Sequence, residues 1–171
     1  MPSLIDILIS SIITLSIALF TVYVRERLRQ SSLRKQILSA ILSEAKTNLK
    51  LISEIKYYLD LTEKNLQKKP PQFLGMMPMV LHEDKTRMAQ NQGLILMIKE
   101  DLYDKILDAS FWVSSYNQLV DQFGITRILI SVEDGVVRKA LSLMAHMSIR
   151  AKALEPILME VQKSLETMLD P

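Results

Sequence analysis

The sequence lacks cysteine and is poor in the residues that break helices. Its 171 residues include no Cys, four Gly, six Pro, two His and one Trp. Without cysteine the chain can form neither disulfides nor thiol-based sites, which agrees with a cytoplasmic domain. Because Gly and Pro are scarce, the chain has few turns, and long helices are expected.

Sequence motifs of catalysis are also missing. There is no glycine-rich phosphate loop and no Gly-x-Ser-x-Gly sequence. His82 and His146 are far apart, and neither has a second metal ligand at a helical spacing of three or four residues. We therefore expect no enzymatic activity, no metal or other cofactor, and no small-molecule substrate.

Charge is nearly absent from the first two dozen residues. The run Leu4–Val24 contains 21 residues, of which 15 are apolar, and Asp6 carries its one side-chain charge. A helix of this length spans about 31 Å, close to the roughly 30 Å of a bilayer core. Ser3 and Asp6 have the spacing of a helix start. These features predict a transmembrane anchor over residues 1–24.

Two other interpretations of this run fit less well. A cleaved signal peptide has positive charge before a shorter apolar region, whereas here the basic residues follow a long one. A buried core helix has a shorter apolar stretch of about 10–14 residues.

A basic cluster follows at residues 25–35. By the positive-inside rule it predicts a single-pass protein of the cell membrane, with the N-terminus outside and the C-terminal domain cytoplasmic. The same side chains are expected to lie at the membrane surface, with the lipid bilayer as a partner. The cluster consists of Arg25, Arg27, Arg29, Arg34 and Lys35.

The remaining residues, 36–171, have the periodicity of an α-helical bundle. Apolar residues recur every three or four positions up to about Lys69, with Leu49 among them. They recur again over 94–123, in a helix expected to lie between Gly93 and Gly124, and again from about Asp134 to Leu169. Pro156 lies in the last stretch, where we expect a kink or a restart. The predicted class is all-α: a transmembrane helix continuing into a long amphipathic helix, then an antiparallel helical hairpin or three-helix bundle.

Several polar residues within these helices have two interpretations each. Glu44 and Asn48 lie one turn apart and could cap a helix or pair across the bundle. Trp112, followed by Ser114–Asn117, marks either a ligand pocket or a packing residue. The acidic residues Glu100, Asp104 and Asp108 form a surface for a cation or a partner, a solvated face, or a face that opposes Lys46, Lys50 and Lys56. The chain has both basic and acidic stretches, which can pack against each other. The basic stretch therefore does not indicate nucleic acid, which we do not expect as a partner.

The connection at 70–92 is unusually apolar. Seven of the nine residues in 73–81 are apolar, although connections between helices are usually polar. They either cap the end of the bundle or form a docking surface for a cytoplasmic protein or a second copy of the chain. The candidate partner contacts are Phe73, Leu74, Met76, Met77 and Met79.

Two functions therefore stay open at this point. The first is a membrane-anchored scaffold or protein-interaction module at the cytoplasmic face. The alternative is a membrane effector that oligomerises through its span and perturbs or gates the bilayer; the span has only a weak small-residue face for that purpose.

Overall fold

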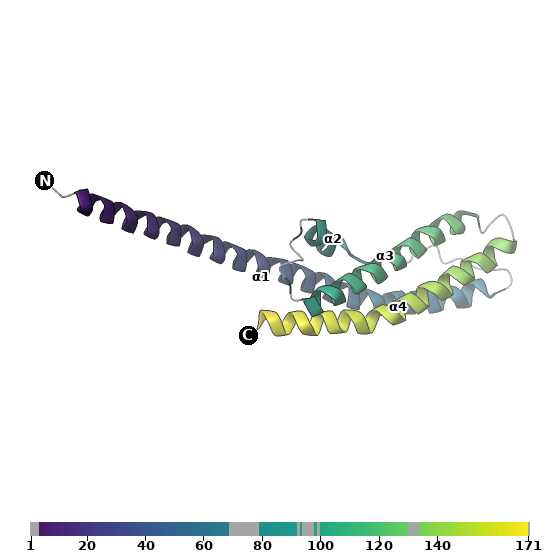
Figure 1. The fold of residues 1–171 in the computed structure, drawn as a ribbon. Helices are drawn as coiled ribbons and strands as arrows, with labels where there is room; N and C mark the ends of the chain where they lie inside the picture. The colour runs from purple at the N-terminus through teal and green to yellow at the C-terminus, as the bar shows by residue number, and fades with distance from the viewer. Residues whose placement is uncertain are drawn as a thin grey trace. The chain divides into compact units, whose positions relative to one another are not determined.

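The computed structural model describes residues 4–68, 79–91, 93, 98, 100–129 and 134–170, with the side chains of residues 4–11, 127–129 and 134 left out. These residues form four helices and no strand (Figure 1), which confirms the all-α class. The helices are α1 (Leu4–Leu66), α2 (Asp84–Asn91), α3 (Glu100–Leu129) and α4 (Asp134–Leu169).

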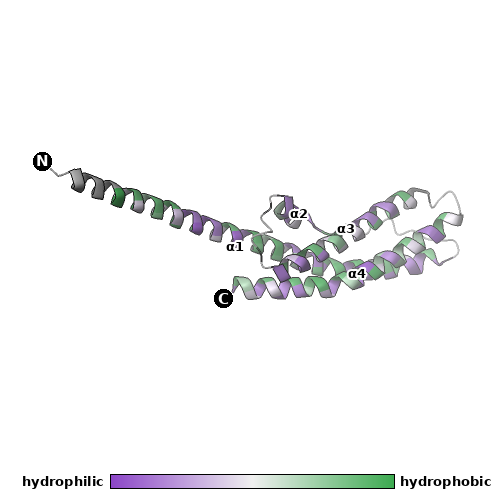
Figure 2. Ribbon diagram, viewed as in Figure 1, coloured by the Kyte–Doolittle hydropathy of each residue, from purple (hydrophilic) through white to green (hydrophobic). Residues whose placement is uncertain are grey.

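The chain divides into two compact units, residues 1–36 and 37–171. In the first unit, the turns of α1 change from hydrophobic to hydrophilic along the chain (Figure 2). The large apolar side chains described between Ile12 and Leu28 are exposed; Ile12 and Phe20, for example, are 62% and 67% exposed.

The predicted transmembrane anchor is wrong on this structure. Among the residues whose side chains are described, no helix is apolar over a length that would cross a membrane. Within α1, the charged residues Arg25–Arg27 follow Val24 directly. The predicted single-pass membrane localisation is corrected with this finding.

The second unit is a bundle in which α4 runs antiparallel to both other long helices. Lys46 and Lys56 of α1 form ion pairs with Glu166 and Glu155 of α4, so residue numbers rise along one helix as they fall along the other. Lys105 of α3 likewise pairs with Glu160. Helices α1 and α3 are therefore parallel, and the chain between them must return along the bundle.

The predicted apolar stripes form the core of this bundle. Ile52 and Ile55 of α1, Ile106 of α3 and Leu154 of α4 are each at most 1% exposed. Leu49, which the stripe also included, is only partly buried. Helix formation here follows from burial of these stripes against one another more than from local propensity.

Two helices continue through residues that were expected to interrupt them. Helix α3 passes Gly124 and ends at Leu129, although Gly124 was predicted to end it. A glycine inside a helix costs about 1 kcal/mol relative to alanine. The burial of Phe123 and Thr126 on either side offsets that cost. Helix α4 likewise continues through Pro156 as one helix.

Two hydroxyl groups in the core have no hydrogen-bond partner among the described residues, those of Thr62 and Tyr116. Tyr116 is completely buried. Desolvation by this burial raises the pKa of Tyr116 above its ordinary range. The buried hydroxyl of Tyr116 therefore lowers the stability of the folded state, because it loses its hydrogen bonds to water on burial.

Candidate functional site

Two asparagines from different helices hold an extended stretch of the returning connection. Asn48 of α1 donates from Nδ2 to the carbonyl of His82 over 2.7 Å, and its Oδ1 accepts the His82 N–H over 2.8 Å. Asn117 of α3 bonds the N–H and carbonyl of Leu81 in the same way, both at 2.9 Å. We call Asn48 and Asn117 the amide clamp, and residues 79–91 the held segment.

The amide clamp imitates the pairing of a β-sheet. In an extended chain, the N–H and C=O of one residue point to one side and those of the next residue to the other. Leu81 therefore faces α3 with its main-chain groups, and His82 faces α1. Each carboxamide supplies one donor and one acceptor, which is the set that a neighbouring strand would provide.

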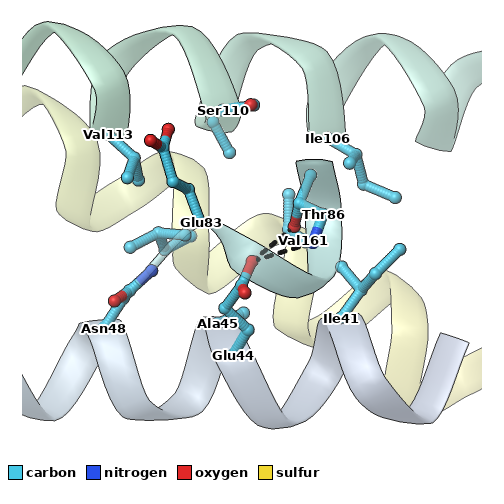
Figure 3. A pocket seen from close by; sticks show the side chains of 12 residues that line it. Ile41, Glu44, Ala45, Asn48, Glu83, Thr86, Ile106, Ser110, Val113 and Val161 are labelled. Carbon is cyan, nitrogen blue, oxygen red and sulfur yellow. Dashed lines mark hydrogen bonds between the residues drawn. The ribbon is translucent and has the colours of Figure 1, made fainter. Parts of the chain in front are cut away.

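A buried carboxylate anchors the second half of the held segment. Glu44, 8% exposed, accepts the N–H of Lys85 over 2.6 Å, and the N–H and hydroxyl of Thr86 over 3.2 and 2.6 Å. Figure 3 shows the carboxylate rising from α1 to the first turn of α2. It caps that helix from outside and faces the positive end of its dipole. Burial of the carboxylate is compensated by these three bonds. Of the two interpretations given for Glu44, the hydrogen bonds favour capping.

Beside this cap lies a small cavity between α1, α3 and α4. Its walls include Ile41, Asn48, Thr86, Ile106 and Val161 (Figure 3). Its volume is about 20 Å³, which is room for about one water molecule. The hydrogen bonds beside this cavity position a peptide segment.

No family model, curated protein or solved structure matches this chain. The geometry of the site is therefore the basis for its interpretation. In the part of the chain that the structure describes, no three His, Asp or Glu side chains gather where they could hold a metal ion.

Only one of the predicted partner contacts falls among the described residues. Met79 is 40% exposed, at the start of the held segment. Two further apolar side chains of the segment are also exposed, Val80 at 54% and Met88 at 55%. The other predicted contacts, Phe73, Leu74, Met76 and Met77, lie outside the described residues.

The predicted basic cluster lies on the first unit, with its side chains exposed except for Arg34, which is half-buried. Arg29 forms an ion pair with Glu26, one turn before it, at 3.0 Å. The hydrogen bond from Arg29 lowers the pKa of Glu26. The surface role predicted for Arg25, Arg27, Arg29, Arg34 and Lys35 stays a prediction.

The acidic face of α3 does not oppose the lysines of α1. Lys46 and Lys56 pair with α4 instead, and Asp104 and Asp108 are exposed. The exposure of these residues agrees with a solvated face and argues against one that opposes the lysines of α1.

Trp112 is a packing residue at the border of the core. It is partly buried against the apolar cluster. The Arg150 guanidinium of α4 lies 4.9 Å from the ring centroid, and Phe111 contacts the ring edge-on. The cation–π contact joins α3 to α4, as expected for a packing role.

Sequence reasoning missed Asn117 as a functional residue. It was noted only as a neighbour of Trp112, although it holds Leu81 as firmly as Asn48 holds His82. The available signal was an asparagine next to a buried stripe position, Tyr116, where a polar side chain requires a partner.

Proposed function

We propose that the protein is a protein-interaction module, in which the bundle holds a short segment in place and the outer face of that segment contacts a partner protein. The observation that carries the proposal is the exposure of Met79, Val80 and Met88 on a segment fixed by seven hydrogen bonds to Glu44 and the amide clamp.

Physical chemistry favours this use of the segment. Exposed apolar side chains on a fixed backbone bind with less loss of conformational entropy than the same side chains on an unrestrained loop. Methionine adapts its shape to a partner surface. The buried side of the segment, with Leu81 at 1% exposure, anchors it, and the exposed side stays available.

The proposal is tested by site-specific photo-crosslinking of the full chain in cells. A photo-reactive amino acid replaces Met88, and in a matched control it replaces Gln118, an exposed position on α3. We expect a discrete protein adduct from position 88 that position 118 does not give. The mass of the adduct distinguishes a second copy of the chain from a different protein.

A second variant separates contact from folding. Changing Met79, Val80 and Met88 together to Ser removes the exposed apolar surface and leaves the seven hydrogen bonds in place. We expect an unchanged melting temperature and the loss of an adduct formed from a neighbouring position, Asn91. An adduct that persists in this variant, or identical products from positions 88 and 118, would contradict the proposal.

A further inference from the structure

The contacts that hold the segment are mostly contacts to its main chain. Four bonds of the amide clamp and two of the three bonds to Glu44 end on backbone N–H or C=O groups; the third ends on the Thr86 hydroxyl. Three side chains of the segment are buried, Leu81, Thr86 and Ala89. The groove thus recognises an extended peptide that carries Leu, leads into a helix and has Thr five residues after the Leu.

The segment contributes little to the core of the bundle. Among the described core residues it supplies Leu81 and Ala89, whereas each long helix supplies seven or more. A region with few buried apolar contacts opens at a lower free energy than the core beside it. Helices α1, α3 and α4 can therefore stay packed while the segment leaves.

Departure of the segment leaves a groove that requires a replacement. Glu44 and Asn48, buried in the closed state, lose their partners, and unpaired polar groups in such a place are costly. The groove is best stabilised by a peptide that supplies the same main-chain groups and the same three buried side chains, equivalent to Leu81, Thr86 and Ala89, at the same spacing.

We infer that this groove is a peptide-binding site which the chain fills with its own residues 79–91, and that it also accepts the same segment from a second copy of the chain. A second copy supplies all seven bonds and all three anchors. The segment is tethered on both sides, by residues 69–78 and 92–99, which can extend to at most about 35 Å and about 28 Å. A released segment therefore reaches a second bundle that lies within both of these distances, without unwinding of α1 or α3. Such exchange of an identical element is a low-cost route to assembly. The inference concerns the buried side of the segment and does not rest on the proposed function.

The test mixes two complementary variants of the full chain. Leu81→Asp removes the apolar anchor of the segment and leaves the groove residues unchanged. Asn48→Ala removes two hydrogen bonds of the groove and leaves the segment residues unchanged. Because the chain has no cysteine, Lys152→Cys on the exposed surface of α4 takes a donor dye in one population and an acceptor in the other. In the unaltered protein, the segment of a second copy competes poorly with the groove's own segment, because the own segment is covalently tethered and has a high effective concentration.

Energy transfer should report an affinity between the two variants that is at least ten-fold higher than the affinity between two labelled populations of Leu81→Asp. The mixture of two Leu81→Asp populations measures the background from any other self-association. Equal transfer in the two mixtures, with both variants helical by circular dichroism, overturns the inference.

A second measurement on the unaltered chain covers the case in which a variant fails to fold. In hydrogen exchange, the amides of Leu81 and Thr86 should exchange at least ten-fold faster than the helix-centre amides of Ile52 and Val113. Exchange of the segment at the rate of the core would mean that it opens only when the whole bundle unfolds, and the inference would then be wrong.

Discussion

The held segment and the three-helix core are held in place by opposite means. The core is fixed by apolar side chains such as Ile52 and Leu154, which bury surface without requiring particular partners. The segment is fixed by Glu44 and the amide clamp, whose polar atoms form hydrogen bonds to specified atoms. Apolar burial gives the bundle its stability, and directional bonding gives the segment its position.

This difference predicts that a substitution in the core will destabilise the whole bundle, whereas a substitution in the clamp will affect the held segment alone. Loss of a core side chain weakens every helix that packs against it, because the contacts are shared. Loss of a clamp residue frees one stretch of backbone and leaves the packing of the helices unchanged. The following four changes test the contrast, from the largest expected effect to the smallest.

The largest effect is expected from Ile106→Asp in the core. The carboxylate would be buried without a partner, and the free energy of unfolding should fall by about 3–5 kcal/mol. The control Gln118→Asp, on the exposed face of the same helix, should change it by at most about 0.5 kcal/mol. Denaturant unfolding followed by circular dichroism measures both, and equal effects would mean that the apolar stripe of α3 has no special role.

A smaller and more local effect is expected from Asn48→Ala. The N–H and C=O of His82 lose their partner, which costs about 1–3 kcal/mol. Hydrogen exchange should accelerate in the held segment and stay unchanged around Ile52. The control Asn65→Ala removes an asparagine that bonds within its own helix, to Leu61, and should leave the segment unaffected. Equal acceleration of amide exchange in the held segment and around Ile52 would show that the two regions open together, which would contradict the prediction.

Tyr116→Phe is expected to stabilise the protein. It removes a buried hydroxyl that has no partner among the described residues, a gain of about 1 kcal/mol. Its pKa is raised in the folded state, so the phenol of the unfolded chain ionises first as pH rises above about 10, and stability falls there. Thermal melts between pH 8 and 11 should show this alkaline loss in the original protein and less of it in the variant. A lower melting temperature for Tyr116→Phe at pH 8 would show that the hydroxyl has a favourable partner.

The smallest effect is expected from Lys46→Ala at the surface of the bundle. The hydrogen bond from Lys46, with a second from Gln162, lowers the pKa of Glu166 from its ordinary value. A lowered folded-state pKa adds stability above the unfolded value and loses it as pH falls through the folded one. Melting temperatures measured from pH 6 to 3 should therefore depend less on pH in Lys46→Ala. Lys50→Ala, an exposed lysine on the same helix, should keep the original dependence; identical curves for the two variants would contradict the ion-pair explanation.

The same contrast explains which parts of the structure could be predicted. Helical stripes repeat every three or four residues, so Ile55, Ile106 and Leu158 could be assigned to the core from their spacing alone. Glu44 could be suspected as a cap because a carboxylate beside a stripe must find donors. Its partner, the N-terminus of α2, is 41 residues away and follows no period.

The boundaries and the membrane prediction fail for different reasons. Gly124 was expected to end a helix because local propensity disfavours it, and tertiary burial of Phe123 overrides that preference. The transmembrane prediction depended on the nearly uncharged length from Leu4 to Val24, whereas no helix among the described residues is long and apolar enough to cross a membrane. Asn117 lies next to a buried stripe position, but its partner could not be assigned, because one asparagine in a helix does not indicate which backbone it will bind.

The parallel course of α1 and α3 has a consequence for how the chain folds. Trp112 and Arg150 lie 38 residues apart (150 minus 112), whereas Lys56 and Glu155 lie 99 apart. Contacts of short sequence separation form first, because less loop entropy is lost in closing them. The hairpin of α3 and α4 should therefore assemble early, and α1, although synthesised first, has to wait for it. During synthesis on the ribosome, α1 thus emerges with its apolar stripe uncovered until the C-terminal half of the protein has been made.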